Sequence, residues 1–251
     1  AFAGTVTEHT GTVTITDAAT VAQFNTINAE TTQNVVLSGG VSDTAAAYAA
    51  TDGATTAGLT AIAAQDADVA ITISDAPTVA QLVTINAATT GAITLSTTNG
   101  ALSGSAANLV LAFAGTVTEH TGTVTITGSV NVSQLKTIND ATTGDITLEV
   151  TSDSLFGTAS DLADAFAGTV TTHTGTVIIT DEPTASQLKT INDATTGAIT
   201  LNDVNGALSD SAANLVDAFA GTVTEHTGTV TITDAATIAQ LTTIDAETTG
   251  T

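Results

Sequence analysis

The feature that most constrains this chain is a long phrase that it repeats. Residues Thr222–Gly250 read TVTEHTGTVTITDAATIAQLTTIDAETTG, and close copies begin at Thr5, Thr116 and Thr169. A diverged copy covers Val69–Gly91. Self-similarity at a fixed spacing is the signature of repeat architectures, in which each unit buries its apolar face against its neighbours. We therefore expect one array rather than a set of unrelated domains.

The array has a 53-residue period. Two aromatic positions recur at that spacing, at Phe113, Phe166 and Phe219 and at His120, His173 and His226. Each period divides into a 22-residue half and a 31-residue half, as from Ile126 to Leu148 and from Leu148 to Ile179. The sequence thus predicts a single array over residues 1–251, with an irregular insertion near 48–64 where a helix is lengthened or broken in two.

Each half-period predicts one strand and one helix. Residues 12–16 alternate Thr with Val or Ile, the period of two that marks a half-buried strand. Asp17 follows, and then a helix with Val21, Phe24 and Ile27 on one face. A second helix is expected to start near Ser209–Ser211 and to end at an Ala-Gly pair.

Helix ends are predicted from three residue types. Pro77 and Pro183 are expected in the first helical turn, where a missing N–H costs nothing. Asp75 and Asp181 stand just before them and are expected to cap the same helix or to complement its dipole. Each first helix is expected to stop at Thr-Thr-Gly with a glycine C-cap, at Gly91, Gly144 and Gly197.

The segment lengths predict the architecture. A five-residue strand advances ~17 Å and a ten-residue helix returns ~15 Å, so a 22-residue step brings the next strand alongside in parallel. One strand face is Thr, which indicates a face open to solvent. We therefore expect an α/β fold, a right-handed solenoid similar to leucine-rich repeats. About nine parallel strands should form one sheet, with short helices on its outer face. A flattened 53-residue coil with two sheets is the alternative.

Charge excludes two classes of partner. Lys plus Arg total 2 against 25 Asp plus Glu, which gives a net charge of −23. Nucleic acid and anionic membrane surfaces both attract cationic proteins, so neither is expected to bind. No run approaches the ~20 apolar residues of a membrane span. No cofactor is predicted, although many scattered carboxylates permit weak calcium binding.

Metal binding is one possible role of the four histidines. His9, His120 and His226 follow Glu, and His173 follows Thr. Glu-His pairs suit a transition metal, but repeats separated by another strand lie ~9–10 Å apart, too far for two imidazoles to share one ion. We expect structural histidines that hydrogen-bond their neighbours, and no metal or catalytic residue.

Other polar residues have structural interpretations too. Residues 202–206, Asn-Asp-Val-Asn-Gly, resemble the start of a calcium loop but lack its closing Glu, which favours an Asx-Gly turn. Lys136 and Lys189 are expected to pair with Asp140 and Asp193 along their own helices. A ladder of side chains that satisfies turn backbone groups is expected at Asn28, Asn86, Asn139, Asn192 and Asp245.

Threonine rows form the candidate binding surface. A flat hydroxyl and methyl array could bind ice, a glycan or a mineral, whereas the plain interpretation is that Thr suits exposed strands. Ile178 interrupts the row. The candidate residues are Thr14, Thr16, Thr72, Thr125, Thr127, Thr180, Thr231 and Thr233.

Two phrases resemble known repeats. TDAATIAQLTTIDAETTG (233–250) and SDSAANLVDAFAGTV (209–223) look like repeat regions of very large secreted or cell-surface proteins of marine bacteria, cyanobacteria in particular. The resemblance implies an adhesin-like, surface-layer or motility-associated role outside the cell, and it carries over no catalytic residue.

The leading hypothesis is therefore a non-enzymatic structural solenoid, a rod or scaffold in an extracellular or cell-surface protein. The alternative is a surface-binding module that uses the Thr rows. An enzyme such as a polysaccharide lyase would need a base and cationic charge stabilisation, which two Lys on helices do not supply. Both ends fall within a repeat, with Ala1–Gly4 matching a helix tail. Partners are therefore expected to be a longer array, another copy end to end, or a cell-surface glycan.

Overall fold

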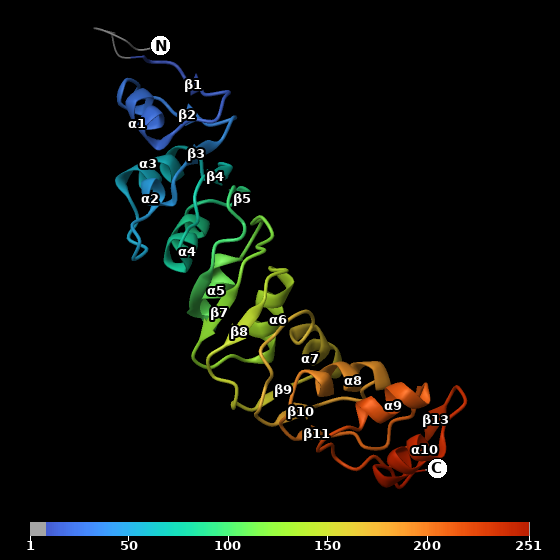
Figure 1. Ribbon diagram of the computed structural model, residues 1–251. Coiled ribbons are helices and arrows are strands. Elements are labelled where there is room, and N and C mark those ends of the chain that lie inside the picture. Colours follow the sequence, from blue (N-terminus) through green and yellow to red (C-terminus); the bar gives the residue numbers. More distant parts are fainter. Residues whose placement is uncertain (1–8, 251) are drawn as a thin grey trace. The chain divides into compact units, whose positions relative to one another are not determined.

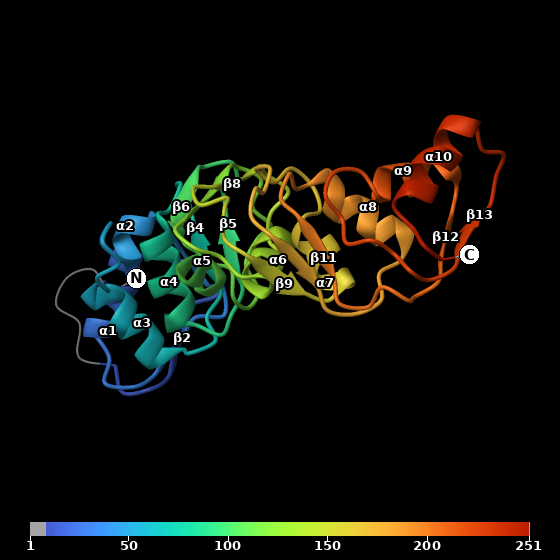
Figure 2. The same ribbon diagram turned by 90° about the horizontal axis from the view of Figure 1, so that it is seen from below.

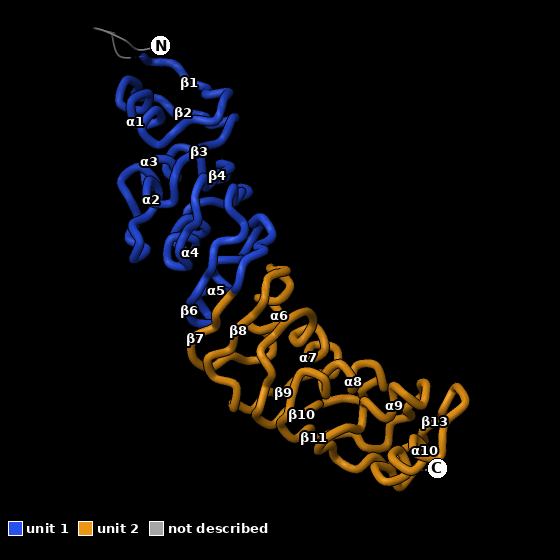
Figure 3. Tube along the Cα trace, in the orientation of Figure 1, with its two compact units in different colours: residues 1–123 blue, residues 124–251 orange. Residues whose placement is uncertain are grey.

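The structure is a computed structural model that describes residues 9–250 (Figures 1 and 2). The expected helix tail at Ala1–Gly4 lies outside the described residues. The chain divides into two compact units, residues 1–123 and residues 124–251 (Figure 3). Each unit alternates short strands with short helices.

Unit 1 contains both the first repeat and the insertion. Its elements are β1 (Val13–Thr14), α1 (Val21–Ala29), β2 (Val35–Val36), β3 (Val41–Asp43), α2 (Ala45–Tyr48), α3 (Ala57–Gln65), β4 (Ile71–Ile73), α4 (Val79–Ala88), β5 (Ile93–Leu95), β6 (Leu102–Ser105) and α5 (Ala106–Ala112).

Unit 2 contains the more regular repeats. Its elements are β7 (Val124–Thr127), α6 (Val132–Asp140), β8 (Ile146–Leu148), β9 (Leu155–Gly157), α7 (Ala159–Ala165), β10 (Val177–Ile179), α8 (Ala185–Asp193), β11 (Ile199–Leu201), β12 (Leu208–Asp210), α9 (Ala212–Ala218), β13 (Val230–Ile232) and α10 (Ile238–Ala246).

The 22-residue step is a parallel strand pair, as predicted. Val13 pairs with Val35 in β1 and β2, and Ile71 pairs with Ile93 in β4 and β5. The same offset joins β7 to β8 and β10 to β11 in unit 2. A strand, a helix and two tight turns therefore fit within this step, and the α/β class with parallel strands is confirmed.

The predicted single sheet of nine strands is wrong, because the 31-residue step does not join adjacent strands. It contains a short strand that the sequence analysis did not predict: β3, β6, β9 or β12. In unit 2, β10 pairs with β9 and β11, and β12 pairs with β13. The described strands therefore lie in several small sheets. Each added strand is three or four residues long, too short for its alternation to stand out from the loop around it.

The core lies between the strands and the helices, and it is made of aliphatic side chains. Alternate strand residues point inward, so Val177 and Ile179 of β10 are fully buried while Ile178 between them is partly exposed. Each longer helix contributes residues three apart, such as Leu188 and Ile191 of α8, which are also fully buried. This matches the predicted periods of two and of three to four.

Helix starts are built on a capping box that the prediction overlooked. Thr184 is the N-cap of α8, where its hydroxyl accepts from the Gln187 N–H and the Gln187 side chain accepts from the Thr184 N–H. The same T-x-x-Q box begins α1, α4 and α10. Pro183 therefore precedes the cap instead of occupying the first helical turn, and that placement was wrong.

The aspartates predicted to cap their own helices each cap an earlier helix instead. Asp181 Oδ1 accepts from the Ala159 N–H at the first residue of α7, at 2.7 Å. Asp234 does the same for Ala212 of α9, and Asp75 for Ala45 of α2. Helix N-terminal N–H groups lack partners within the helix, so each of these helices obtains one acceptor from a segment further along the chain.

The predicted glycine C-caps at Gly91, Gly144 and Gly197 are wrong as well. The first helices end three or four residues earlier, and a positive φ is found instead at glycines such as Gly115, at the Ala-Gly ends of the second helices. Gly197 is needed for space, because a Cβ there would collide with the carbonyl oxygen of Gly175 in the neighbouring turn. A close approach of two backbones accounts for this glycine.

The insertion near 48–64 breaks one helix into two, α2 and α3, as predicted. A turn at Gly53, with a φ of 88°, separates them. The end of α3 then substitutes for a strand partner: Gln65 Oε1 accepts from the Val35 N–H and Asp66 Oδ2 from the Leu37 N–H. Side chains thus satisfy both N–H groups at the edge of β2, where β5, β8 and β11 each use one backbone carbonyl and one threonine hydroxyl.

Replacing Asp181 by Ala should lower the free energy of unfolding by ~1 kcal/mol, the usual cost of a lost helix cap. Asp181→Asn keeps an acceptor oxygen and should cost less. Asp145→Ala is the matched control, because Ala92 and Ala198 occupy the equivalent position in other repeats. Urea denaturation measures all three, and equal stabilities for D181A and D145A would contradict the capping role.

Candidate functional site

One phrase of the chain is repeated most faithfully: Thr-Val-Thr-Glu/Thr-His-Thr-Gly. It joins neighbouring turns of the chain by hydrogen bonds, and we call this hydrogen-bonded segment the lock. In residues 116–122, Val117 bridges to Ile93 in parallel. The Thr118 hydroxyl accepts from the Leu95 N–H at 3.1 Å and lies 3.3 Å from the Ile93 carbonyl oxygen. Thr171 and Thr224 repeat this bonding on β8 and β11. The segment thus continues the sheet edge with a side chain in place of one backbone group.

Each histidine of this lock is buried against a phenylalanine of the preceding helix end. His120 Nε2 lies 2.7 Å from the Gly100 carbonyl oxygen, and His173 Nε2 lies 2.8 Å from that of Asp153. Since a carbonyl oxygen only accepts, Nε2 carries the proton in both. The ring centroids of Phe166 and His173 are 5.9 Å apart. The predicted structural histidine is confirmed at these positions.

Burial determines the charge of these rings. Removal from water lowers the pKa of His120, His173 and His226, while hydrogen bonds to backbone carbonyls raise it by a smaller amount. The folded protein therefore favours neutral imidazole. A neutral ring can still bind a metal, but no cluster of three or more His, Cys, Asp or Glu side chains suited to a metal occurs within residues 9–250.

The stability of the protein should fall as the pH drops below the unfolded-state pKa of histidine, ~6.5. In that range the histidines bind protons in the unfolded chain but not in the folded chain, so the free energy of unfolding decreases. The decrease ends once the pH lies below the folded-state pKa values, which are lowered. Urea midpoints measured from neutral to mildly acidic pH follow this loss. Replacing His120, His173 and His226 together by Gln, which retains a donor, should flatten the profile; an unchanged slope would refute the assignment.

The calcium-like stretch 202–206 is a turn, as the sequence favoured. Asp203 Oδ1 accepts from the Asn205 N–H at 3.0 Å, which is an Asx turn. Asn205 Oδ1 accepts from the Thr227 hydroxyl at 2.7 Å, so this side chain also joins the lock. The amide and carboxylate oxygens are thereby directed to protein donors.

The asparagine ladder satisfies helix ends on the neighbouring segment. Asn139 Nδ2 donates to the Asp164 carbonyl oxygen in the last turn of α7, at 2.7 Å, and to the Ala167 carbonyl oxygen just beyond it, at 2.8 Å. Asn86 and Asn192 make the equivalent bonds at the ends of α5 and α9. The predicted role in satisfying backbone groups is confirmed at these three of the five positions, while it stays a prediction at Asn28 and Asp245. The partners lie on the following segment of the array.

The two lysines of the chain also form ion pairs between neighbouring helices. Lys189 Nζ lies 2.9 Å from Asp193 in α8, the predicted i, i+4 pair, and 2.8 Å from Asp217 in α9. Lys136 pairs with Asp164 and Asp161 of α7, whereas its expected partner Asp140 is not bonded to it. These hydrogen bonds raise the pKa of both lysines, which keeps them charged.

The repeat that contains α4 and α5 has two apolar residues in the same place. One period earlier, Val83 of α4 stands where Lys136 stands, and Leu111 of α5 stands where Asp164 stands. Leu111 is more than half exposed. The position thus tolerates either an ion pair or two aliphatic side chains, which indicates a packing role rather than a chemical one.

The candidate Thr rows are exposed or half-exposed, but the structure does not align them as one row. Thr72 lies between Ser42 of β3 and Thr94 of β5, and Thr125 lies beside Thr147 of β8. The remaining candidates are in or directly after other strands, at Thr14 and Thr16 (β1), Thr127 (β7), Thr180 (β10) and Thr231 and Thr233 (β13). Two or three hydroxyls therefore lie side by side in β3–β5, in β7–β8 and in β12–β13, whereas Thr14 lies beside Val36 in β1–β2.

One sheet presents an apolar surface that the sequence analysis missed. Phe156 of β9 is 69% exposed and lies in register beside Ile178 of β10, which is followed by Thr200 of β11. The equivalent residues in β12 and β13 are Ser209 and Thr231. A period-two pattern around Leu155 could have revealed this strand, but three residues are too few.

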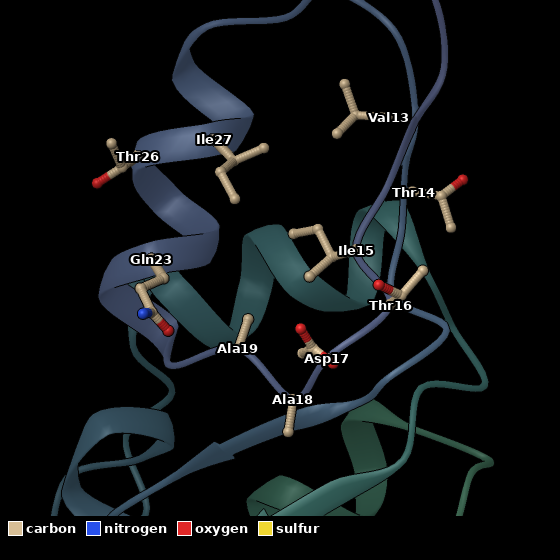
Figure 4. Close-up of a pocket in the computed structure, with 10 residues that line it drawn as sticks. All are labelled: Val13, Thr14, Ile15, Thr16, Asp17, Ala18, Ala19, Gln23, Thr26 and Ile27. Atoms are coloured by element: carbon tan, nitrogen blue, oxygen red, sulfur yellow. The ribbon is translucent and has the colours of Figure 1, made fainter. Parts of the chain in front are cut away.

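A cavity of about 540 Å³ lies beside β1 and α1 in unit 1 (Figure 4). Figure 4 shows Val13, Ile15 and Ile27 directed into the space between strand and helix, while Thr14 points away. Asp17 is the one ionisable side chain among the residues that line it. A cavity of this composition offers apolar contact and has no base paired with a nucleophile.

Comparison with known proteins identifies no relative: no protein-family model matches the chain, and no curated protein or solved structure resembles it significantly. None of the helices within residues 9–250 has the length and apolar character needed to cross a membrane. Functional assignment therefore depends on the site geometry itself.

Proposed function

We propose that this chain is a non-enzymatic structural or adhesive repeat array, a right-handed α/β solenoid that serves as a scaffold in an extracellular or cell-surface protein. The observation that carries this proposal is the use of the recurring polar side chains. Asp181, Asn139, Lys189 and His173 each bond a neighbouring segment that is distant in the sequence. Residues that would supply chemistry in an enzyme are occupied in holding these segments together.

The solenoid part of the proposal is supported by the strand registers. Within unit 2, β9, β10 and β11 pair in parallel with a constant offset, since Leu155 pairs with Val177 and Val177 pairs with Ile199. A helix lies in each connection between them, and parallel crossovers of this kind are right-handed in nearly all proteins. Each strand–helix segment thus contacts the segments before and after it, the arrangement of repeat arrays.

The extracellular part is supported by charge and by protease sites. A net charge of −23 repels other acidic polymers and keeps the protein dispersed in salt. The two cleavage sites for trypsin-like proteases follow Lys136 and Lys189, within α6 and α8. Both lysines are ion-paired to the next helix. An array of this kind resists one common class of extracellular protease while it stays folded.

Proteolysis of intact source cells tests the proposal. Proteinase K, which cuts at many residues, should remove the chain from intact cells, whereas trypsin should leave it whole because a protease needs an unfolded segment at its cleavage site. After denaturation trypsin should give three fragments, 1–136, 137–189 and 190–251. A chain that survives proteinase K until the cells are lysed would place it inside the cell and contradict the proposal.

A surface-binding function is the second candidate, and the in-register hydroxyls of Ser42, Thr72 and Thr94 favour it. If these residues bind an insoluble glycan or ice, Thr72→Val with Thr94→Val should weaken that binding by ~30-fold, measured by co-sedimentation or thermal hysteresis, since two hydrogen bonds worth ~1 kcal/mol each are lost. Valine keeps the β-branched shape. Thr32→Val, at an exposed loop position, is the control. If the unmodified chain binds neither ice nor glycan, the surface-binding function is excluded and the scaffold function remains.

A further inference from the structure

The last helix of unit 2, α10, has an open apolar face. Ile238 is 85% exposed and Leu241 is 46% exposed. Figures 1 and 2 show α9 and α10 side by side, and α9 packs against α10. Side chains this apolar are usually buried when they follow a helical period. The face is therefore a surface that favours a partner.

The equivalent residues elsewhere in unit 2 are buried by a following helix. Val132 and Leu135 of α6 are 5% and 0% exposed, and Leu188 of α8 is 0% exposed. Helix α6 packs against α7, and α8 lies between α7 and α9. The second neighbour that α8 has in α9 has no counterpart beside α10 among the described residues. The chain itself thus shows which kind of element covers this face.

A strand edge lies next to the open helix face. Val230 and Ile232 of β13 pair with β12 on one side. In the equivalent strand β10, the opposite side is occupied by β11. Beside β13 lies a groove of about 470 Å³, whose apolar lining is Val230, Ile232, Leu241 and Ile244 and whose remaining lining is Thr242, Asp245, Thr248 and Gly250. The free edge of β13 and the exposed face of α10 together form a surface on which one strand and one helix could pack.

We propose that this end of unit 2 is a docking site for one further segment of the chain's own type: a short parallel strand like Ile199–Leu201, followed by a helix like α9. The strand would extend the sheet at β13, as β11 does at β10. The helix would bring counterparts of Ala212 and Leu215, which in α9 are buried beside α8, onto Ile238 and Leu241. Two alanines at the start of AANLVDA allow close helix approach.

The contact between α10 and the docked helix would be apolar rather than ionic. The lysine that joins α8 to α9 is replaced in α10 by Thr242, one period after Lys189. No ion pair is therefore required, and apolar contact drives the docking. This inference rests on the proposed array function, because it describes how such an array accepts another segment.

A cysteine probe tests the docking directly, since the chain has no cysteine of its own. In the full chain carrying Ile238→Cys, the thiol should react freely with a maleimide. A synthetic peptide of residues 199–221, added up to about 1 mM, should slow that reaction ~10-fold or more, as expected when the thiol is covered in most molecules. The same peptide with Leu215→Asp should give no protection, and Leu111→Cys in the full chain should react equally fast with and without peptide.

A second variant carries the segment as part of the same chain, so that weak binding of the separate peptide cannot hide the docking. Thr251 corresponds to Ala198 in the period, so residues 199–221 appended after Thr251 continue the register. Protection of the thiol at position 238 in this extended chain, absent when the appended residues are scrambled, supports the proposal as peptide protection does. If neither the peptide nor the extension protects, the proposal is overturned. Protection that rises with the concentration of the unextended chain assigns the face to a second copy and also overturns it.

Failure of the docking differs from failure of the scaffold function. An unprotected thiol at position 238, together with intact-cell sensitivity to proteinase K, would leave a surface scaffold whose end is merely exposed. A protected thiol in a chain that is released only by cell lysis would leave a docking array inside the cell. The two readouts are independent.

Discussion

The structure depends on hydrogen bonds that each strand–helix segment obtains from its neighbours. A helix of only two or three turns leaves N–H and carbonyl groups without partners at both ends, a large fraction of its backbone. In unit 2, Asp181 supplies the acceptor at the start of α7, and Asn139 supplies the donor beyond its end. One short helix is thus completed from both sides by residues of its neighbours. Such a segment is expected to be unstable by itself and to become stable when neighbouring segments of the array supply these hydrogen bonds.

Small apolar side chains make this repeated docking feasible. Most of the core is Ala, Val, Ile and Leu, and three phenylalanines recur at one position per period, beside a histidine. Adjacent strands lie close together, whereas helices of ordinary composition prefer ~8–10 Å. Alanines such as Ala159, Ala212 and Ala218 on the second helices reduce that conflict. The unusual composition is therefore a consequence of the repeat geometry.

Polar residues in this chain illustrate how periodicity separates structure from chemistry. A lone His beside a Glu could have been a metal ligand, and a lone Lys in an acidic protein could have been a binding residue. Here His173 donates to a carbonyl oxygen and Lys189 joins two helices, while the repeat that contains α4 and α5 replaces the Lys–Asp pair by Val83 and Leu111. A position that accepts such a replacement contributes packing. The proposed scaffold function follows from these substitutions more than from any single contact.

Local patterns determined the 22-residue parallel step, the alternation of strand and helix, and the break in the insertion, because each depends on residues that are close in the sequence. The same patterns predicted that Asn139 and His173 would satisfy backbone groups. They did not show that Asp181 caps another helix, that Gly197 makes room for Gly175, or that β9 is a strand. Those three features depend on which segments become neighbours in space. A carboxylate or a glycine carries no mark of its distant partner, so the tertiary structure alone decided them.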